Sequence, residues 1–255
     1  MSTKTPKPRQ PDRYDPSEYQ AFAVTVDVVI FTMVDGVLNV LLVRRGQDPF
    51  GGSWAVPGGF KLPTETLDVA ARRELVEETG VDAKALLVQL GAYGDPHRDP
   101  RMDVVTVAYV AVMRDVGTVA AGSDAAEAEL VPVSEVMKGR FQLAFDHDRI
   151  VADAVERVRR DLESTGIATA FVGATFTLSE LRAVYEAVWD IELDGANFRR
   201  RMTAEEGWVV PTGKQATPGV EGGKPPELFR AGRAWKQGGP VRRPRRGQPQ
   251  RRTQR

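Results

Sequence analysis

The sequence predicts an α/β protein in two parts: a sandwich of mixed β-sheet and flanking helices, followed by a smaller domain of two helices and a β-hairpin. Runs of β-forming residues alternate with helical patterns up to about residue 163, and a second helical stripe then begins. The charge balance changes at the same place. Residues 1–164 carry 19 Lys+Arg against 26 Asp+Glu, whereas residues 165–255 carry 16 against 9. Such an asymmetry indicates two modules with different partners.

Local patterns predict the elements of the first part. Residues 24–34 and 37–44 are typical of two strands joined by Asp35-Gly36, a strong hairpin signal. We expect further strands at 54–56, 86–92, 104–113 and 129–133, and helices at 64–80, 134–137 and 145–162. We expect the first domain to span 21–163 and the second 164–236, with a disordered arm at 1–20 and a disordered arginine-rich tail at 237–255.

The composition excludes several classes of protein. The chain has 255 residues, 42% hydrophobic and 27% charged, as is ordinary for a globular protein. It has no cysteine, so disulfides and thiolate metal sites are excluded, and a cytoplasmic location is expected. No apolar run approaches the roughly 20 residues of a membrane helix, and residues 1–20 lack the apolar stretch of a signal peptide. We therefore expect no membrane partner.

One predicted helix carries an unusual concentration of acid. Glu74, Glu77 and Glu78 fall at i, i+3 and i+4, so their carboxylates project from one helical face and repel one another. Leu67 and Leu75 lie on the opposite face and can anchor the helix on a core. A hard divalent cation such as Mg²⁺ takes oxygen ligands and removes the repulsion. The alternative is an acidic amphipathic helix with ordinary caps.

Residues 59–81 resemble the Nudix box, Gly-x5-Glu-x7-Arg-Glu-U-x-Glu-Glu-x-Gly-U, where U is a bulky aliphatic residue. Every constrained position is met, by Gly59, Glu65, Arg73, Glu74, Leu75, Glu77, Glu78, Gly80 and Val81. The resemblance implies an α/β/α Nudix sandwich that binds a nucleoside diphosphate linked to another moiety. It implies Glu74, Glu77 and Glu78 as ligands of Mg²⁺ or Mn²⁺. Arg73 and Glu65 would orient them, so that Glu65, Arg73, Glu77 and Glu78 form the candidate catalytic set.

Ligand-binding residues are expected around this motif. The glycines at its start, Gly58 and Gly59, let the backbone approach a ligand, and the carbonyl of Gly58 is a further candidate metal ligand. Arg98 and Arg101, in a proline-rich loop, are either phosphate or ribose clamps or surface ion-pair residues. For a general base the nearest guesses are Asp124, Glu127 and Glu129, with a polar loop as the alternative. His97 and His147 are assigned no role.

The second part predicts a winged helix-turn-helix. An apolar stripe over residues 178–189 follows the capping residue Thr177, a basic helix follows at 195–202, and strands at 208–211 and 228–230 bracket a Gly/Pro/Lys-rich loop. Arg and Asn donors match base edges and phosphates, so the candidate DNA-binding residues are Asn197, Arg199, Arg200, Arg201, Lys224 and Arg230, with Lys214 nearby. The alternative is a solvated basic helix face.

The segments at 177–188, 197–201 and 222–230 resemble the C-terminal half of the NrtR family of Nudix-related transcriptional regulators of NAD metabolism, and the loop at 94–101 also resembles that family. The resemblance implies a repressor of NAD biosynthesis or salvage genes that senses ADP-ribose and binds a palindromic operator as a homodimer. This chain has Lys224 where the family often has arginine. Its intact Nudix box leaves a second hypothesis open: a magnesium-dependent ADP-ribose pyrophosphatase whose basic tail binds nucleic acid nonspecifically.

Overall fold

The fold is that of a computed structural model of the chain. It describes residues 15–79, 86–116, 125–204, 206–217, 225–233 and 241–243. The strands are β1 (Ala23–Val34), β2 (Val37–Arg45), β3 (Trp54–Ala55), β4 (Gly58–Phe60), β5 (Leu86–Tyr93), β6 (Val104–Val112), β7 (Ala125–Pro132), β8 (Val209–Gln215) and β9 (Glu227–Ala231). The helices are α1 (Leu67–Thr79), α2 (Val133–Met137), α3 (His147–Ser164), α4 (Leu178–Trp189) and α5 (Gly195–Ala204), with short 3-10 turns η1 (Pro16–Glu18) and η2 (Ile167–Phe171).

Strands β1 to β7 form one mixed sheet around β1. Its main path runs β3-β2-β1-β6-β5, β4 also pairs with β1, and β7 pairs with β2. The pairing of β1 with β6 is parallel, whereas β1 with β2 and β5 with β6 are antiparallel. The β1–β2 hairpin turns at Asp35-Gly36, where both residues have positive φ, as the Asp-Gly signal predicts. Strand β1 has a hydrogen-bonded strand on each side and is buried over most of its length.

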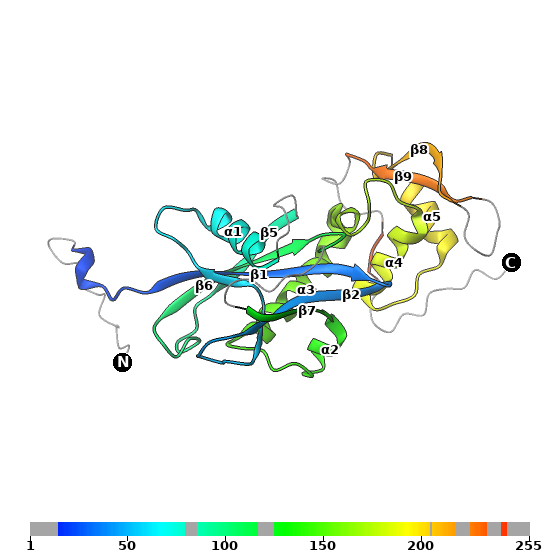
Figure 1. The fold of residues 1–255 in the computed structure, drawn as a ribbon. Coiled ribbons are helices and arrows are strands. Elements are labelled where there is room, and N and C mark those ends of the chain that lie inside the picture. The colour runs from blue at the N-terminus through cyan, green and yellow to red at the C-terminus, as the bar shows by residue number, and fades with distance from the viewer. Residues whose placement is uncertain are drawn as a thin grey trace, which may run out of the picture.

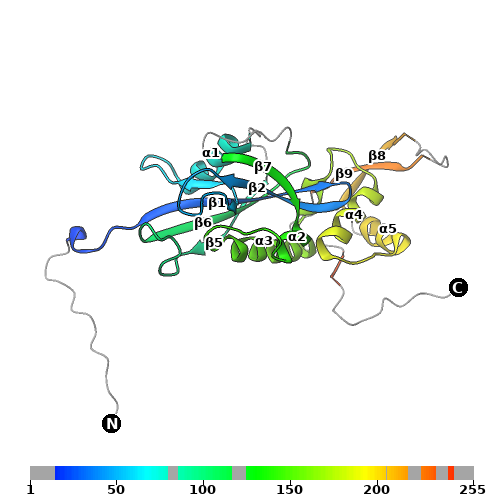
Figure 2. The same cartoon turned by 60° about the horizontal axis from the view of Figure 1, so that its bottom comes forward.

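Two helices cover opposite faces of this sheet (Figures 1 and 2). Alternate residues of β1 point to opposite sides. Val26, Val28 and Ile30 belong to one buried cluster with the α1 residues Ala70, Ala71 and Leu75. Val29 and Phe31 belong to another with the α3 residues Ile150, Ala154, Val158 and Leu162. The α/β/α sandwich predicted from the sequence is thus confirmed.

The second part packs two helices against a short hairpin. Thr177 caps α4 through a capping box: its hydroxyl accepts from the backbone N–H of Glu180, and the Glu180 carboxylate accepts from the backbone N–H of Thr177. Strand β9 pairs with β8 and bridges through Phe229 to Phe176, just before the cap. The helix–helix–hairpin order confirms the winged helix.

The two parts share one hydrophobic core. The cluster that contains Val29 and Ile150 continues without a break into Leu181, Tyr185 and Trp189 of α4. Reciprocal hydrogen bonds join α3 to α4: Arg159 Nε donates to the Val188 carbonyl at 2.9 Å, and Trp189 Nε1 donates to the Arg159 carbonyl at 3.0 Å. Helix α3 therefore belongs structurally to both parts.

Parts of the two terminal segments that were expected to be disordered are among the described residues. Gln20 donates to Asp103 at 2.9 Å, which ties the end of the N-terminal arm to the sheet domain. Val241 is only 3% exposed because it enters the shared core, and Arg243 lies 3.5 Å from Glu156 of α3. Residues 1–14 and most of the tail lie outside the described residues. Within those described, no helix has the length and apolar character needed to span a membrane.

The shared core predicts that the two parts unfold together. Leu162 is fully buried at the α3 end of the core, so Leu162→Ala should lower the free energy of unfolding by about 2–5 kcal/mol. Urea denaturation followed by tryptophan fluorescence should show one transition. Met137→Ala, at an exposed methionine, is the matched control and should change little. Two separate transitions, or equal effects of both variants, would contradict a shared core.

Candidate functional site

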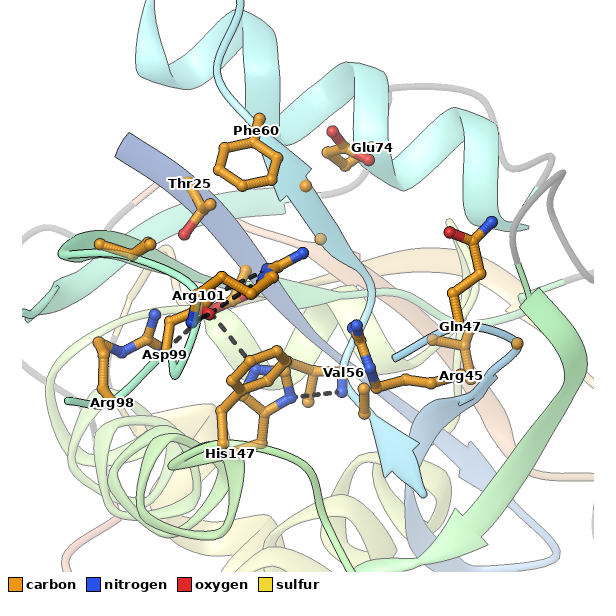
Figure 3. Close-up of a pocket in the computed structure, with 18 of the residues that line it drawn as sticks. Thr25, Arg45, Gln47, Val56, Phe60, Glu74, Arg98, Asp99, Arg101 and His147 are labelled. Atoms are coloured by element: carbon orange, nitrogen blue, oxygen red, sulfur yellow. Dashed lines mark hydrogen bonds and ion pairs between the residues drawn. The ribbon is translucent and has the colours of Figure 1, made fainter. Parts of the chain in front are cut away.

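A cavity of about 420 Å³ opens beside the acidic helix (Figure 3). The glycines of β4 and the α1 residues Arg73, Glu74 and Glu77 form one side, and β1 lies between the two sides. The segment 44–48, the loop at 98–101 and the start of α3 form the other. Many of the residues that line the cavity are polar or charged, and its volume is in the range of sites that bind small molecules such as a nucleotide. Of the residues predicted from the sequence, Gly58, Gly59, Arg73, Glu74, Glu77, Arg98 and Arg101 line it.

Arg73 holds the acidic residues of the motif in one network. Its Nη1 donates to Glu74 at 2.7 Å and to Glu77 at 2.9 Å, while Nε and Nη2 donate to Glu65 at 3.1 and 2.8 Å. The hydrogen bonds from Arg73 lower the pKa of Glu65 to about 2. These contacts are of the kind expected if Arg73 and Glu65 orient the acids, and that role stays a prediction.

Glu74 is the most enclosed of these acids. It is 6% exposed, and burial raises the pKa of its carboxyl group. Gly59 lies directly against its carboxylate, so a Cβ at position 59 would displace the end of the Glu74 side chain. Gly58 is equally tight against the Val26 carbonyl and Asp27. The two glycines are therefore needed for close packing of β4 between β1 and α1.

Glu74 and Glu77 supply carboxylate oxygens, the kind of donor that a hard cation prefers. Both carboxylates converge on one guanidinium nitrogen, Arg73 Nη1, which balances their charge. Among the described residues, no group of three or more His, Asp or Glu side chains is arranged to hold a metal ion. The side chain of Glu78 lies outside the described residues. A cation there would complete its shell with other oxygens, such as water or ligand phosphates.

A second polar cluster forms the cavity wall opposite α1. Arg98 makes a two-pronged contact with Asp146, through Nε at 3.1 Å and Nη2 at 2.5 Å. Asp27 Oδ2 lies 3.7 Å from Arg98 Nη2 and 3.7 Å from His147 Nε2, and it accepts no hydrogen bond from the described residues. Arg98 is thus held by carboxylates on two sides, with its side chain only 5% exposed.

His147 is a site residue that the sequence did not reveal. Its Nδ1 accepts a hydrogen bond from the backbone N–H of Val56 at 3.1 Å, so the neutral ring carries its proton on Nε2, toward Asp27. Burial lowers the pKa of His147. In the sequence, the only indication of a role for His147 is its position next to Asp146, near the start of a predicted helix.

Two arginine–aromatic stacks complete the walls. The Arg45 guanidinium lies 4.8 Å from the Phe145 ring centroid, and that of Arg101 lies 5.6 Å from Phe60. Arg101 also donates to Asp99 at 3.0 and 2.7 Å. Both predicted arginine clamps, Arg98 and Arg101, therefore line the cavity with their charges already paired. Their contact with a ligand stays a prediction.

The predicted general base is not found among the residues at the cavity. Glu127 and Glu129 lie on β7, which pairs with the outer side of β2, and neither lines the cavity. Glu127 instead faces Arg44 at 3.4 Å. Neither glutamate is therefore supported as the base by the lining of the cavity. Asp124 lies outside the described residues.

A separate basic surface lies on α5 and the β8–β9 hairpin. Phe198 and Met202 are buried, which leaves Arg199, Arg200 and Arg201 exposed on the outer face of α5. Arg200 donates to Asn197 Oδ1 at 2.8 Å, and Arg199 donates to Glu227 of β9 at 2.9 Å. Lys214 and Arg230 are exposed on the hairpin, and Lys224 lies outside the described residues. Exposed basic side chains thus lie both on α5 and on the hairpin, and Arg199 joins the two elements through Glu227.

Comparison with known families defines the class of protein first. The NUDIX domain model matches residues 21–154, and the NrtR DNA-binding winged helix domain model matches residues 168–231. The chain therefore belongs to the NrtR family, in which a Nudix domain precedes a DNA-binding winged helix.

Two relatives and one set of crystal structures are similar to the chain. The ADPR responsive transcriptional repressor NtrR of Acinetobacter baylyi is 33% identical over 86% of this chain and 85% of its own length. ADP-ribose pyrophosphatase of Methanocaldococcus jannaschii is 40% identical over 47% of this chain and 70% of its own. Shewanella oneidensis NrtR complexed with a 27mer DNA superposes with a TM-score of 0.71 at 32% identity, covering 85% and 97% of the two chains. Its NUDIX domain complexed with ADP ribose gives 0.52 at 36% identity, covering 57% and 94%.

The buried histidine predicts a pH-dependent stability. The unfolded chain takes up a proton near the ordinary histidine pKa of 6.5, whereas folded His147 resists it. The free energy of unfolding should therefore fall as pH drops below about 6.5, by at most about 1.4 kcal/mol per pH unit. His147→Gln should flatten this fall between pH 7 and 5, and His97→Gln, at an exposed histidine, should not. Equal pH profiles for wild type and His147→Gln would disprove the assignment.

Proposed function

We propose that this protein is a DNA-binding transcriptional repressor of NAD biosynthesis or salvage genes, and that its Nudix domain senses ADP-ribose or a related NAD metabolite. The observation that carries this proposal is the continuous core that joins a nucleotide-sized cavity to a basic winged helix through α3. An enzyme with an unrelated basic tail would have no need for this joint packing. The repressor acts in the cytoplasm, where its operator lies.

The ligand side of the proposal rests on charge and shape. Membership of the Nudix family implies a divalent metal, and we propose Mg²⁺ or Mn²⁺ held by Glu74, Glu77 and Glu78. The metal would supply positive charge to a diphosphate in the cavity. Arg98 and Arg101 would bind phosphate or ribose oxygens by exchanging their present carboxylate partners. Gly58 and Gly59 let the ligand approach the backbone of β4.

The DNA side of the proposal assigns α5 to recognition. Asn197, Arg200 and Arg201 would contact base edges or phosphates, with Arg199 at the junction with the hairpin. Lys214, Lys224 and Arg230 would follow the sugar–phosphate backbone. We propose that two copies bind as a homodimer to a palindromic operator, because a two-fold protein matches a two-fold site.

Hydrolysis of ADP-ribose is the second candidate function. The network of Arg73 with Glu65, Glu74 and Glu77 is complete, so the residues that orient a metal are preserved. The similar archaeal pyrophosphatase supports the same possibility. Turnover also needs a base that activates water. Glu127 and Glu129 of β7 do not line the cavity. We therefore rank regulation first.

The repressor proposal predicts that ADP-ribose releases the protein from DNA. If the ligand binds the DNA-free state better, saturating ADP-ribose with Mg²⁺ should weaken operator affinity roughly 5- to 150-fold, as expected for typical coupling energies. Fluorescence anisotropy with a duplex selected from a randomised pool measures this directly. An unchanged affinity would refute the sensing role.

Two variants separate the two functions in the same assay. Glu77→Gln should abolish metal-dependent hydrolysis, if wild type shows any, and should leave operator binding in the absence of ligand intact. The double change Arg200→Ala with Arg201→Ala should do the reverse. If the arginine variant binds the selected duplex as well as wild type does, the assignment of α5 to recognition is wrong.

A further inference from the structure

Glu227 is the one described carboxylate in direct contact with an arginine of the recognition helix. It lies at the start of β9, and its Oε2 accepts a hydrogen bond from Arg199 Nη2 at 2.9 Å. The Arg199 guanidinium also lies 5.8 Å from the ring centroid of Phe229, which is buried. One partly exposed ion pair and one contact with an aromatic ring therefore hold the side chain of Arg199 at the junction of helix and hairpin.

The next two arginines, Arg200 and Arg201, differ from Arg199 in their contacts. Arg200 contacts the neutral oxygen of Asn197 at 2.8 Å. In the described part of the chain, neither Arg200 nor Arg201 forms an ion pair with a carboxylate. The positive charge of Arg199 is thus locally balanced, whereas the charges of its two neighbours are not. This difference separates residues that look equivalent in the sequence.

We infer that Glu227 is a specificity-determining residue, which restrains Arg199 so that this side chain contributes to operator binding but little to binding of other DNA. This inference rests on the proposed function. A guanidinium has five N–H donors, and Glu227 engages only one nitrogen, so the others remain available in a fixed orientation. On a matching site Arg199 can make its contact while it stays paired.

On DNA that lacks the operator sequence, the pairing of Arg199 with Glu227 should weaken binding. Nonspecific affinity comes almost entirely from cations that neutralise phosphates and release counterions. To reach a phosphate in an arbitrary position, Arg199 must leave Glu227 and Phe229. The carboxylate that remains also repels the DNA. Both effects penalise nonspecific complexes more than the operator complex, which is how an unfavourable element creates specificity.

The test measures two duplexes with the full-length protein. One is selected by the wild-type protein from a randomised pool, and the other is a scrambled duplex of the same length and composition. Glu227→Gln should bind the scrambled duplex roughly two- to fivefold more tightly, a change typical of an exposed ion pair. The plot of log affinity against log salt should steepen by about 0.9, the value for one more neutralised phosphate. Affinity for the selected duplex should change less.

Four further proteins make the result decisive: Glu227→Asp, Glu135→Gln, Arg199→Ala and the double variant Arg199→Ala with Glu227→Gln. Glu227→Asp keeps the charge and should resemble wild type. Glu135→Gln removes a carboxylate of α2 that pairs with Lys138 and Arg140, outside the winged helix, and should have no effect on the salt slope. In an Arg199→Ala background, Glu227→Gln should give a smaller gain, because part of its effect acts through Arg199.

The outcomes are distinguishable. If Glu227→Gln weakens binding to the selected duplex and leaves the salt slope unchanged, Glu227 only stabilises the structure of the winged helix, and the inference is overturned. Equal behaviour of Glu227→Gln and wild type on both duplexes overturns it as well. If the wild-type protein selects no duplex and binds none, it is the proposed function that fails.

Discussion

The packing of α3 is the constraint on which the rest of the structure depends. Its first residue, His147, lies in the wall of the ligand cavity, and its middle covers one face of the sheet. Near its other end, Arg159 exchanges hydrogen bonds with Val188 and Trp189 of the winged helix. Protein interiors are close-packed and transmit strain. A ligand that displaces the start of α3 must therefore either distort the helix or move the surface against which α4 packs.

A second property of the cavity is that several arginine side chains in its lining are paired with carboxylates. Arg73, Arg98 and Arg101 all line it, and all three are already paired with carboxylates. A diphosphate would have to replace some of these partners, so its binding exchanges one set of ion pairs for another. Asp146, which holds Arg98, directly precedes α3. Loss of that contact would act on the end of the helix that joins the two domains.

Much of this organisation could be predicted from the sequence because it depends on local spacing. The hairpin at Asp35-Gly36, the cap at Thr177 and the motif linking Glu65 to Glu74 all involve residues close together in the chain. The wall formed by Asp27, Arg98 and His147 could not be predicted in the same way, since only the sheet topology brings these distant residues together. The catalytic base stays unassigned for the same reason: the polarity of Glu127 and Glu129 is visible in the sequence, but the pairing of β7 with β2 is not. Likewise, only the fold distinguishes Arg199 from Arg200 and Arg201.

The central claim is that the cavity and the basic surface are two ends of one coupled unit. Linkage requires that DNA alter ADP-ribose affinity by the same factor by which ADP-ribose alters DNA affinity. Titration calorimetry of full-length protein with ADP-ribose and Mg²⁺, with and without saturating selected duplex, measures that factor. We expect ADP-ribose to bind at least about fivefold more weakly in the presence of the duplex. Identical ADP-ribose affinities in the two titrations would contradict the claim.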